Sequence, residues 1–161
     1  MSADTAKMYE IAERLGGLCD ITRKLGVRHS IDSMLREKEF IFTPEWVRKQ
    51  KGIVFLKDEN LNMVAVSDGY CKYFGVSRDE YETKADAAIH SLSDANSYRR
   101  NDKACLHNET GYAFLESWTN NNGGRESGLV FKCFQLRAGQ REIRGIIPKE
   151  LIGLKDDREI N

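Results

Sequence analysis

The side chains best suited to catalysis or metal binding are spread thinly along this 161-residue chain. No two cysteines have CxxC spacing, and the histidines show no ligand spacing relative to them. These residues are Cys19, Cys71, Cys105, Cys133, His29, His90 and His107. No Ser/His/Asp, Cys/His or phosphate-loop pattern occurs, and the pair Asp79–Glu80 has the position of acids at a helix start. The sequence therefore predicts neither a metal site nor an enzyme.

One lysine interrupts an apolar strand pattern. Alternation along residues 129–136 places Phe131 on one face and Lys132 on the other. Lys132 either faces solvent or binds an anionic or carbonyl group. Aromatic residues elsewhere would complete a mostly apolar pocket for a small organic ligand, or else simply fill a core. The predicted ligand-binding residues are Tyr70, Phe74, Tyr98, Phe114, Phe131 and Lys132.

Charge and composition indicate the cellular location of the protein. The formal net charge is zero, but residues 21–51 hold eight Lys/Arg against four Asp/Glu, a local charge of +4. No apolar run approaches the ~18 residues of a membrane helix, and the N-terminus lacks the layout of a signal peptide. We therefore expect a cytoplasmic protein with reduced thiols and no membrane partner, a structural disulfide being the alternative.

Residues 1–51 have the pattern of a small, all-helical region. Apolar spacing predicts helices over 4–17 and about 30–39, and Asp20 caps a short helix between them. Thr43-Pro44-Glu45 starts a fourth helix, with Thr at the N-cap and Pro at the first helical position.

The pattern changes to short strands after Gly52. Apolar runs predict strands at 53–56 and 61–66, separated by a turn at 57–60. Helices follow over 68–74, ended by Gly75, over the segment SRDEY capped by Ser77, and over 94–109; the last three strands span 112–119, 128–136 and 142–147. This order predicts an α+β domain with a five-stranded antiparallel sheet and helices on one face.

The stretch IVFLKDENLNMVAVSDGYCKYFGVSRDEYETKAD resembles the ligand-sensing, bacterial type of the PAS family. Ser67 stands where that family usually has Asn, and Thr83 stands where it has Gly. The matching residues are Lys57, Asp58, Gly75, Ser77, Glu80, Lys84 and Asp86. The resemblance implies a metabolite or cofactor held between the inner sheet face and the helices, and a homodimer.

Within that resemblance, neither flavin nor haem is expected. Cys71 sits in Gly-Tyr-Cys-Lys-Tyr and not in the Asn-Cys-Arg-Phe-Leu context of photoactive flavin PAS domains. His90 and His107 match the axial histidine of haem PAS domains by position only. The cofactor stays unidentified, and a small organic ligand is the expectation.

The basic segment resembles, more faintly, phage-repressor-type helix-turn-helix domains. Leu25-Gly26-Val27 matches the turn, and the glycine allows the left-handed residue that the turn needs. Asp32 departs from the pattern, because the recognition helix usually buries a branched apolar residue there. The resemblance implies that Arg28, His29, Ser30 and Ser33 face the major groove, and that Arg23, Lys24 and Arg36 approach phosphates.

We therefore predict three parts: residues 1–51, a helical region with a helix-turn-helix; residues 52–155, a PAS-like sensor; and residues 156–161, a tail. The predicted function is regulation of transcription by a dimeric sensor whose dimer geometry depends on a small molecule. The alternative is a dimerisation or protein-interaction module that does not bind DNA, with residues 1–51 as a helical extension.

Overall fold

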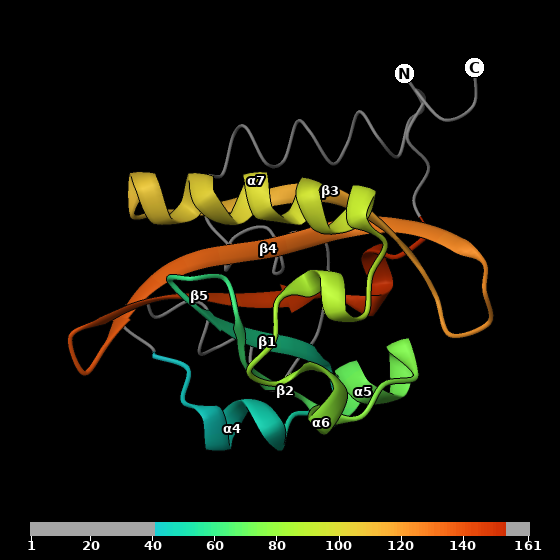
Figure 1. Cartoon of the computed structure of the whole chain (residues 1–161), viewed down its shortest axis with the longest axis horizontal. Helices are drawn as coiled ribbons and strands as arrows, with labels where there is room; N and C mark the ends of the chain where they lie inside the picture. Colours follow the sequence, from blue (N-terminus) through green and yellow to red (C-terminus); the bar gives the residue numbers. More distant parts are fainter. Residues whose placement is uncertain (1–40, 154–161) are drawn as a thin grey trace.

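Five antiparallel strands form one sheet in the computed structural model, in the order β2-β1-β5-β4-β3 (Figure 1). The structure describes residues 41–153. The strands are β1 (Ile53–Asp58), β2 (Met63–Val66), β3 (Gly111–Thr119), β4 (Arg125–Arg137) and β5 (Gln140–Ile147). The helical elements are α4 (Pro44–Arg48), α5 (Asp68–Phe74), α6 (Arg78–Tyr81), η1 (Asp86–Ala88), α7 (Leu92–Asn108) and η2 (Lys149–Leu151).

The predicted α+β fold with a five-stranded antiparallel sheet is confirmed. Of the helices predicted in residues 1–51, only the one that starts at Thr43 falls within the described residues, and it forms α4. The others, and the tail 156–161, lie outside them. No helix within residues 41–153 is long and apolar enough to cross a membrane.

The sheet separates two apolar layers, because successive side chains of a strand point to opposite faces. On the inner face, covered by α5, α6 and α7, Phe55 and Trp118 are buried. On the outer face, Val47 of α4 packs with Val54 and Phe131. Each fully buried side chain of this size contributes roughly 1.5–3 kcal/mol. The prediction of helices on one face therefore holds for α5–α7, while α4, from the preceding helical region, covers the other face.

Helix ends follow the predicted capping residues. Thr43 caps α4 with Pro44 at its first position, and the Ser67 hydroxyl accepts a hydrogen bond in the first turn of α5. Ser77 forms a capping box at the start of α6, and Gly75 ends α5 in the left-handed region, with φ of 68°. These local signals fix the ends of the short helices on both faces of the sheet.

The turn predicted at 57–60 begins later in the structure. β1 continues through Lys57 and Asp58, which pair with β5. Leu61, predicted to start the second strand, has φ of 65° and lies in the turn, so that β2 starts at Met63. Charged residues suggested a turn, but strand pairing across the sheet decides the conformation here.

Other boundaries differ from the predictions by a few residues. α7 begins at Leu92 and not at residue 94, because Ser91 accepts a hydrogen bond from the Asp94 backbone and caps the helix two residues earlier. β4 begins at Arg125, within the segment expected to be a hairpin connection, because its pairing with β3 continues to Thr119.

A side-chain amide of β4 holds the segment that leads into α4. Gln135 accepts a hydrogen bond from the Phe42 backbone nitrogen at 2.9 Å and donates one to the Phe42 carbonyl oxygen at 3.0 Å. The same amide donates to Glu142 at 2.9 Å, and Arg137 forms two bonds to that carboxylate. The amide pairs with the backbone as a neighbouring strand would, and fixes Phe42 on the outer sheet face.

Thr83 adopts a backbone conformation that suits glycine. Its φ is 73°, although it is β-branched and exposed. The strained residue is held in place by a hydrogen bond of 2.7 Å from its backbone nitrogen to the Met63 carbonyl oxygen. The connection between α6 and η1 is therefore tied to the edge strand β2 at an energetic cost.

Replacing Thr83 by glycine is expected to raise the free energy of unfolding by about 1 kcal/mol, because glycine relieves the left-handed strain. Urea unfolding of the purified chain measures the change. The control is Thr110→Gly at an exposed position without positive φ, where about 0.5–1 kcal/mol should be lost. A loss of stability in both variants would contradict the assignment of strain to Thr83.

Candidate functional site

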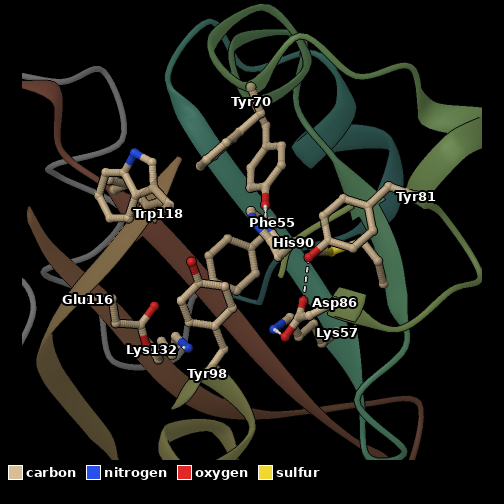
Figure 2. A pocket seen from close by; sticks show the side chains of 13 residues that line it. Phe55, Lys57, Tyr70, Tyr81, Asp86, His90, Tyr98, Glu116, Trp118 and Lys132 are labelled. Atoms are coloured by element: carbon tan, nitrogen blue, oxygen red, sulfur yellow. Dashed lines mark hydrogen bonds and ion pairs between the residues drawn. The ribbon is translucent and has the colours of Figure 1, made fainter. Parts of the chain in front are cut away.

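A small cavity lies between the inner sheet face and the helices that cover it (Figure 2). Its volume is about 20 Å³, close to the space that one water molecule occupies. The strands contribute Phe55, Lys57, Met63, Glu116, Trp118, Lys132 and Ile147 to its lining; the helical side contributes Tyr70, Phe74, Tyr81, Asp86, His90 and Tyr98. The cavity therefore combines aromatic walls with an unusual number of ionisable groups.

Five charged side chains form an alternating chain beside this cavity. Lys132 bonds to Glu116 and to Asp102, each at 2.7 Å. Lys57 then links Asp102, at 2.7 Å, to Asp86, at 2.8 Å. Each charge lies next to opposite charges, and a carboxylate stands at both ends. The Tyr81 hydroxyl caps the Asp86 end with a short hydrogen bond.

Lys132 and Asp102, within this charged chain, stay ionised at neutral pH. Burial alone would lower the pKa of Lys132, but the charges and hydrogen bonds of Asp102 and Glu116 outweigh it and raise that pKa above its usual range. Burial alone would raise the pKa of Asp102, but its two lysine partners lower it. Lys132 is therefore a protonated ammonium group and not an amine nucleophile.

Aromatic rings and one histidine form much of the remaining lining. The Tyr70 hydroxyl meets His90 Nε2 at 3.3 Å, and the His90 ring makes edge-on contacts with Phe74 and Tyr98. Burial lowers the pKa of His90 to about 4, so the ring is neutral at pH 7. The Tyr98 hydroxyl donates to the Ser117 carbonyl oxygen at 2.6 Å and ties α7 to β3.

The structure brings together four of the six predicted ligand-binding residues. Tyr70, Phe74, Tyr98 and Lys132 line the cavity. Lys132 is buried, which excludes the solvent-facing alternative. Phe114 lies beside the cavity with its ring 5.8 Å from the Lys132 nitrogen, in a neighbouring cluster.

Phe131 does not line this cavity. It packs on the outer sheet face with Phe42 and Val47, because neighbours in a strand point to opposite faces and Lys132 points inward. The DNA-contact residues predicted at positions 23–36 lie outside the described residues. Of the two histidines matched by position to a haem ligand, His90 lines the cavity and His107 is exposed near the end of α7.

Most of the charged chain was missed from the sequence. Lys57 was expected in a turn, and Asp102 reads as one more polar residue within a helix. A signal for Glu116 was present, because Phe114, Glu116 and Trp118 alternate onto one face of β3. No sequence signal pairs Asp102 with residues 45 positions before it and 30 positions after it.

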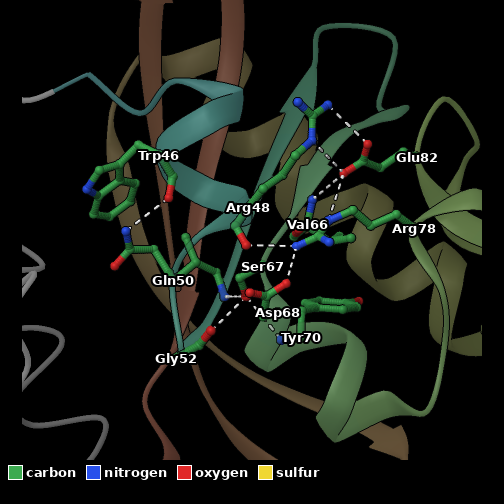
Figure 3. Close-up of polar contacts among 11 residues, drawn as sticks. Trp46, Arg48, Gln50, Gly52, Val66, Ser67, Asp68, Tyr70, Arg78 and Glu82 are labelled. Carbon is green, nitrogen blue, oxygen red and sulfur yellow. Dashed lines mark hydrogen bonds and ion pairs between the residues drawn. The ribbon is translucent and has the colours of Figure 1, made fainter.

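A second polar cluster joins α4 to the helices of the inner face (Figure 3). Arg78 of α6 donates to the Arg48 carbonyl oxygen at 2.7 Å and to the Val66 carbonyl oxygen at 3.1 Å. The Arg48 side chain in turn bonds twice to Glu82, whose carboxylate also accepts from the Val66 backbone at 3.0 Å. The end of α4 is thus attached to β2 and α6.

The start of α5 is attached to the linker that follows α4. The Ser67 hydroxyl donates to the Gly52 carbonyl oxygen at 2.7 Å and accepts from the Tyr70 backbone at 3.0 Å. Gly69 lies so close to this linker that a Cβ atom would stand 2.1 Å from the Lys51 carbonyl oxygen. The helix that carries Tyr70 into the cavity therefore also contacts the linker that follows α4.

Comparison with known proteins identifies this architecture. Residues 47–147 match the family described as PAS fold. The chain belongs to the PAS family. Its strands β1–β5 and its cavity lie within the matched residues or at their edge, so the cavity is that of the PAS domain. No curated protein sequence matches the chain.

Several solved PAS structures are similar to this domain in fold. The PAS domain of Bordetella pertussis BvgS has 14% identity and a TM-score of 0.53, covering 73% of this chain and 87% of that one. A PAS domain of an HTR-like protein from Haloarcula marismortui has 13% identity and a TM-score of 0.52, covering 63% and 83%.

Vibrio cholerae VqmA is also similar, with 14% identity, a TM-score of 0.54 and coverage of 68% of this chain and 53% of that one. A structure of VqmA bound to DPO has 14% identity and a TM-score of 0.52, covering 60% and 52%. The chain thus spans about half the length of the VqmA structures. At these identities, the likenesses show the fold alone.

Removing the central carboxylate of the charged chain is expected to destabilise the PAS domain strongly. Asp102→Ala should lower the free energy of unfolding by about 3–5 kcal/mol, because Lys57 and Lys132 would remain buried without their shared partner. The control is Arg125→Ala, which breaks an exposed pair with Asp94 and should cost less than about 1 kcal/mol. Equal losses in urea unfolding would contradict a central role for Asp102.

His90 is expected to make the PAS domain acid-sensitive between pH 6.5 and about 4. Since its pKa is lowered in the folded state, the unfolded chain binds a proton in this range while the folded chain does not, and stability falls as the pH falls. Relative to His90→Gln, the wild type should lose about 3 kcal/mol between pH 7 and pH 4. Parallel pH profiles of the two proteins would exclude this role for His90.

Proposed function

We propose that this protein is a cytoplasmic, dimeric PAS sensor that regulates transcription through a DNA-binding unit within residues 1–51. A small molecule in the PAS cavity changes the dimer arrangement, and with it the spacing of two recognition helices. The proposal includes no reaction, because both lysines of the cavity are held in ion pairs with its carboxylates.

The observation that carries the proposal is that the cavity and the linker to the N-terminal region share one short helix. α5 carries Tyr70 and Phe74 into the cavity. Its first turn is bonded to the linker through Ser67, and the Gly69 backbone nitrogen donates to the Gln50 carbonyl oxygen at 3.3 Å. A ligand that displaces Tyr70 would therefore move the attachment of α4, which leads back into the basic segment.

The contacts around Arg78 make this attachment stiff. Arg78 connects α6 to the last turn of α4, and Glu82 binds Arg48 from the same side. Because these bonds reach both backbone and side chains, α4 cannot shift without breaking several of them. Two discrete arrangements of α4, each favoured by one state of the cavity, would meet the physical requirement for coupling between the sites.

The charge distribution and one similar protein support a link to DNA. Residues 21–51 have a net charge of +4 and include the predicted contacts Arg28 and Arg36. Structures of VqmA are described as bound to DPO, as a VqmA–ligand–DNA complex, and as a dimer of a LuxR-type receptor whose conformation differs without target DNA. By analogy, this PAS domain would couple a ligand to a DNA-binding unit.

A second candidate is a dimerisation or protein-interaction module without DNA binding. Asp32 favours it, because an acidic residue at a normally buried position weakens the helix-turn-helix pattern. In this case residues 1–51 form a helical extension, and their basic residues form an ordinary solvated surface.

The two candidates differ in a DNA-selection experiment with the full chain at two salt concentrations. We expect selection of a palindromic site, with an affinity that falls steeply as salt rises. Arg28→Glu/Arg36→Glu should reduce that affinity roughly a hundredfold or more. The control, Lys72→Glu/Lys103→Glu, makes the same charge change at exposed positions of the PAS domain and should have little effect.

Loosening the α4 attachment provides a second arm of the same assay. Arg78→Ala removes the bonds to Arg48 and Val66 without touching the predicted DNA contacts, and should weaken DNA binding about fivefold. If no duplex is selected at either salt concentration, the DNA-binding proposal is wrong and the interaction module is the better reading.

A further inference from the structure

The charged chain beside the cavity has a formal net charge of −1. Three carboxylates face two ammonium groups, and each of the five residues is at most 6% exposed. His90 does not compensate, because its neutral form is favoured by burial. An uncompensated buried charge costs several kcal/mol, so a positive partner at this site would be strongly favoured.

Glu116 presents the unused part of that charge to the cavity. Its Oε2 atom takes both polar contacts, from Lys132 at 2.7 Å and from Asn101 at 2.8 Å. Among the described residues 41–153, none bonds to its other oxygen, Oε1. That oxygen keeps a small accessible surface and is not completely buried. Glu116 is 5% exposed and lines the cavity below Trp118, as Figure 2 shows. The site thus offers a buried hydrogen-bond acceptor with negative charge.

The aromatic walls favour the same kind of partner. The Lys57 nitrogen lies 5.4 Å from the Phe55 ring centre, and the Lys132 nitrogen lies 5.6 Å from that of Tyr98. These rings already attract cations, because the faces of aromatic rings carry negative potential. Tyr70 and Trp118 add two more rings to the lining.

The lysines of the cavity are poor sites for an anion. Lys57 and Lys132 each bond to two carboxylates and so use two of the three donors of an ammonium group. An anionic ligand would approach three carboxylates, which outnumber the two ammonium groups, and would be repelled by them. The cavity therefore discriminates by charge, and the preferred sign is positive.

We infer that the PAS cavity binds a small protonated organic amine, with its N–H group on Glu116 Oε1 and its carbon atoms against the aromatic walls. This inference names the ligand class of the sensor and rests on the function proposed above. Because the cavity measures only about 20 Å³, close to the space of one water molecule, organic amines, methylammonium included, require the aromatic side chains to move. Such movement would include Tyr70, the residue that connects the cavity to the α4 attachment.

Calorimetric titration and thermal unfolding of the full chain test the charge preference directly. The probes are methylammonium and benzylammonium chloride, with benzyl alcohol and sodium benzoate as neutral and anionic counterparts, all at matched ionic strength. We expect at least one ammonium probe to bind and to raise the unfolding temperature, while benzyl alcohol and benzoate do neither. Binding of benzoate or benzyl alcohol as tight as that of the amines, or no binding of either amine, would overturn the inference.

A variant pair tests the assignment to Glu116. Glu116→Gln keeps the shape of the side chain but removes its charge, and should weaken amine binding about tenfold or more. Glu59→Gln makes the same change in an exposed turn and should bind like the wild type. Unchanged binding by Glu116→Gln would refute the assignment. If that variant does not fold, the wild-type probe series still decides the sign of the ligand.

The outcome is independent of the DNA experiment. Amine binding without selection of any duplex would support the proposed ligand class and contradict the transcriptional role. Selection of a duplex by a protein that binds neither amine would support the transcriptional role and contradict the proposed ligand class.

Discussion

The domain is organised around the burial of five alternating charges. Lys57, Lys132, Asp86, Asp102 and Glu116 come from β1, β4, η1, α7 and β3, so that one polar structure connects the sheet with its helical cover. Each of these groups would be costly to bury alone. The position of each is therefore set by the others, and the helices cannot be repacked on the sheet without separating charges. The aromatic walls, the small cavity and the placement of α7 all depend on this arrangement.

Much of the fold follows from local sequence. Alternation of apolar residues predicts the strands, and Thr43, Ser67, Ser77 and Gly75 predict the ends of short helices. These signals act within a few residues and therefore depend little on the rest of the fold. Boundaries were less predictable where long-range pairing extends a strand, as it does for β1 through Lys57.

The site was harder to predict because its determinants are far apart in the sequence. Asp102 can be recognised as a site residue only once the sheet places Lys57 and Lys132 beside it. In the sequence alone it looks like any polar helix residue, and such residues are normally solvated. The aromatic residues were easier, because large apolar side chains near an inner sheet face lie in or beside a core. Phe131 shows the limit of that argument: the prediction listed both Phe131 and Lys132 as ligand-binding, although adjacent residues of a strand point to opposite faces and only Lys132 lines the cavity.

The small volume of the cavity has a consequence for the timing of the response. Any ligand larger than a water molecule can enter only after lining side chains such as Tyr70 have moved, so association includes a conformational step and is slower than diffusion. The same step precedes release, which lengthens the lifetime of the complex. The sensor proposed above would therefore average its signal over time and respond little to brief changes in ligand concentration.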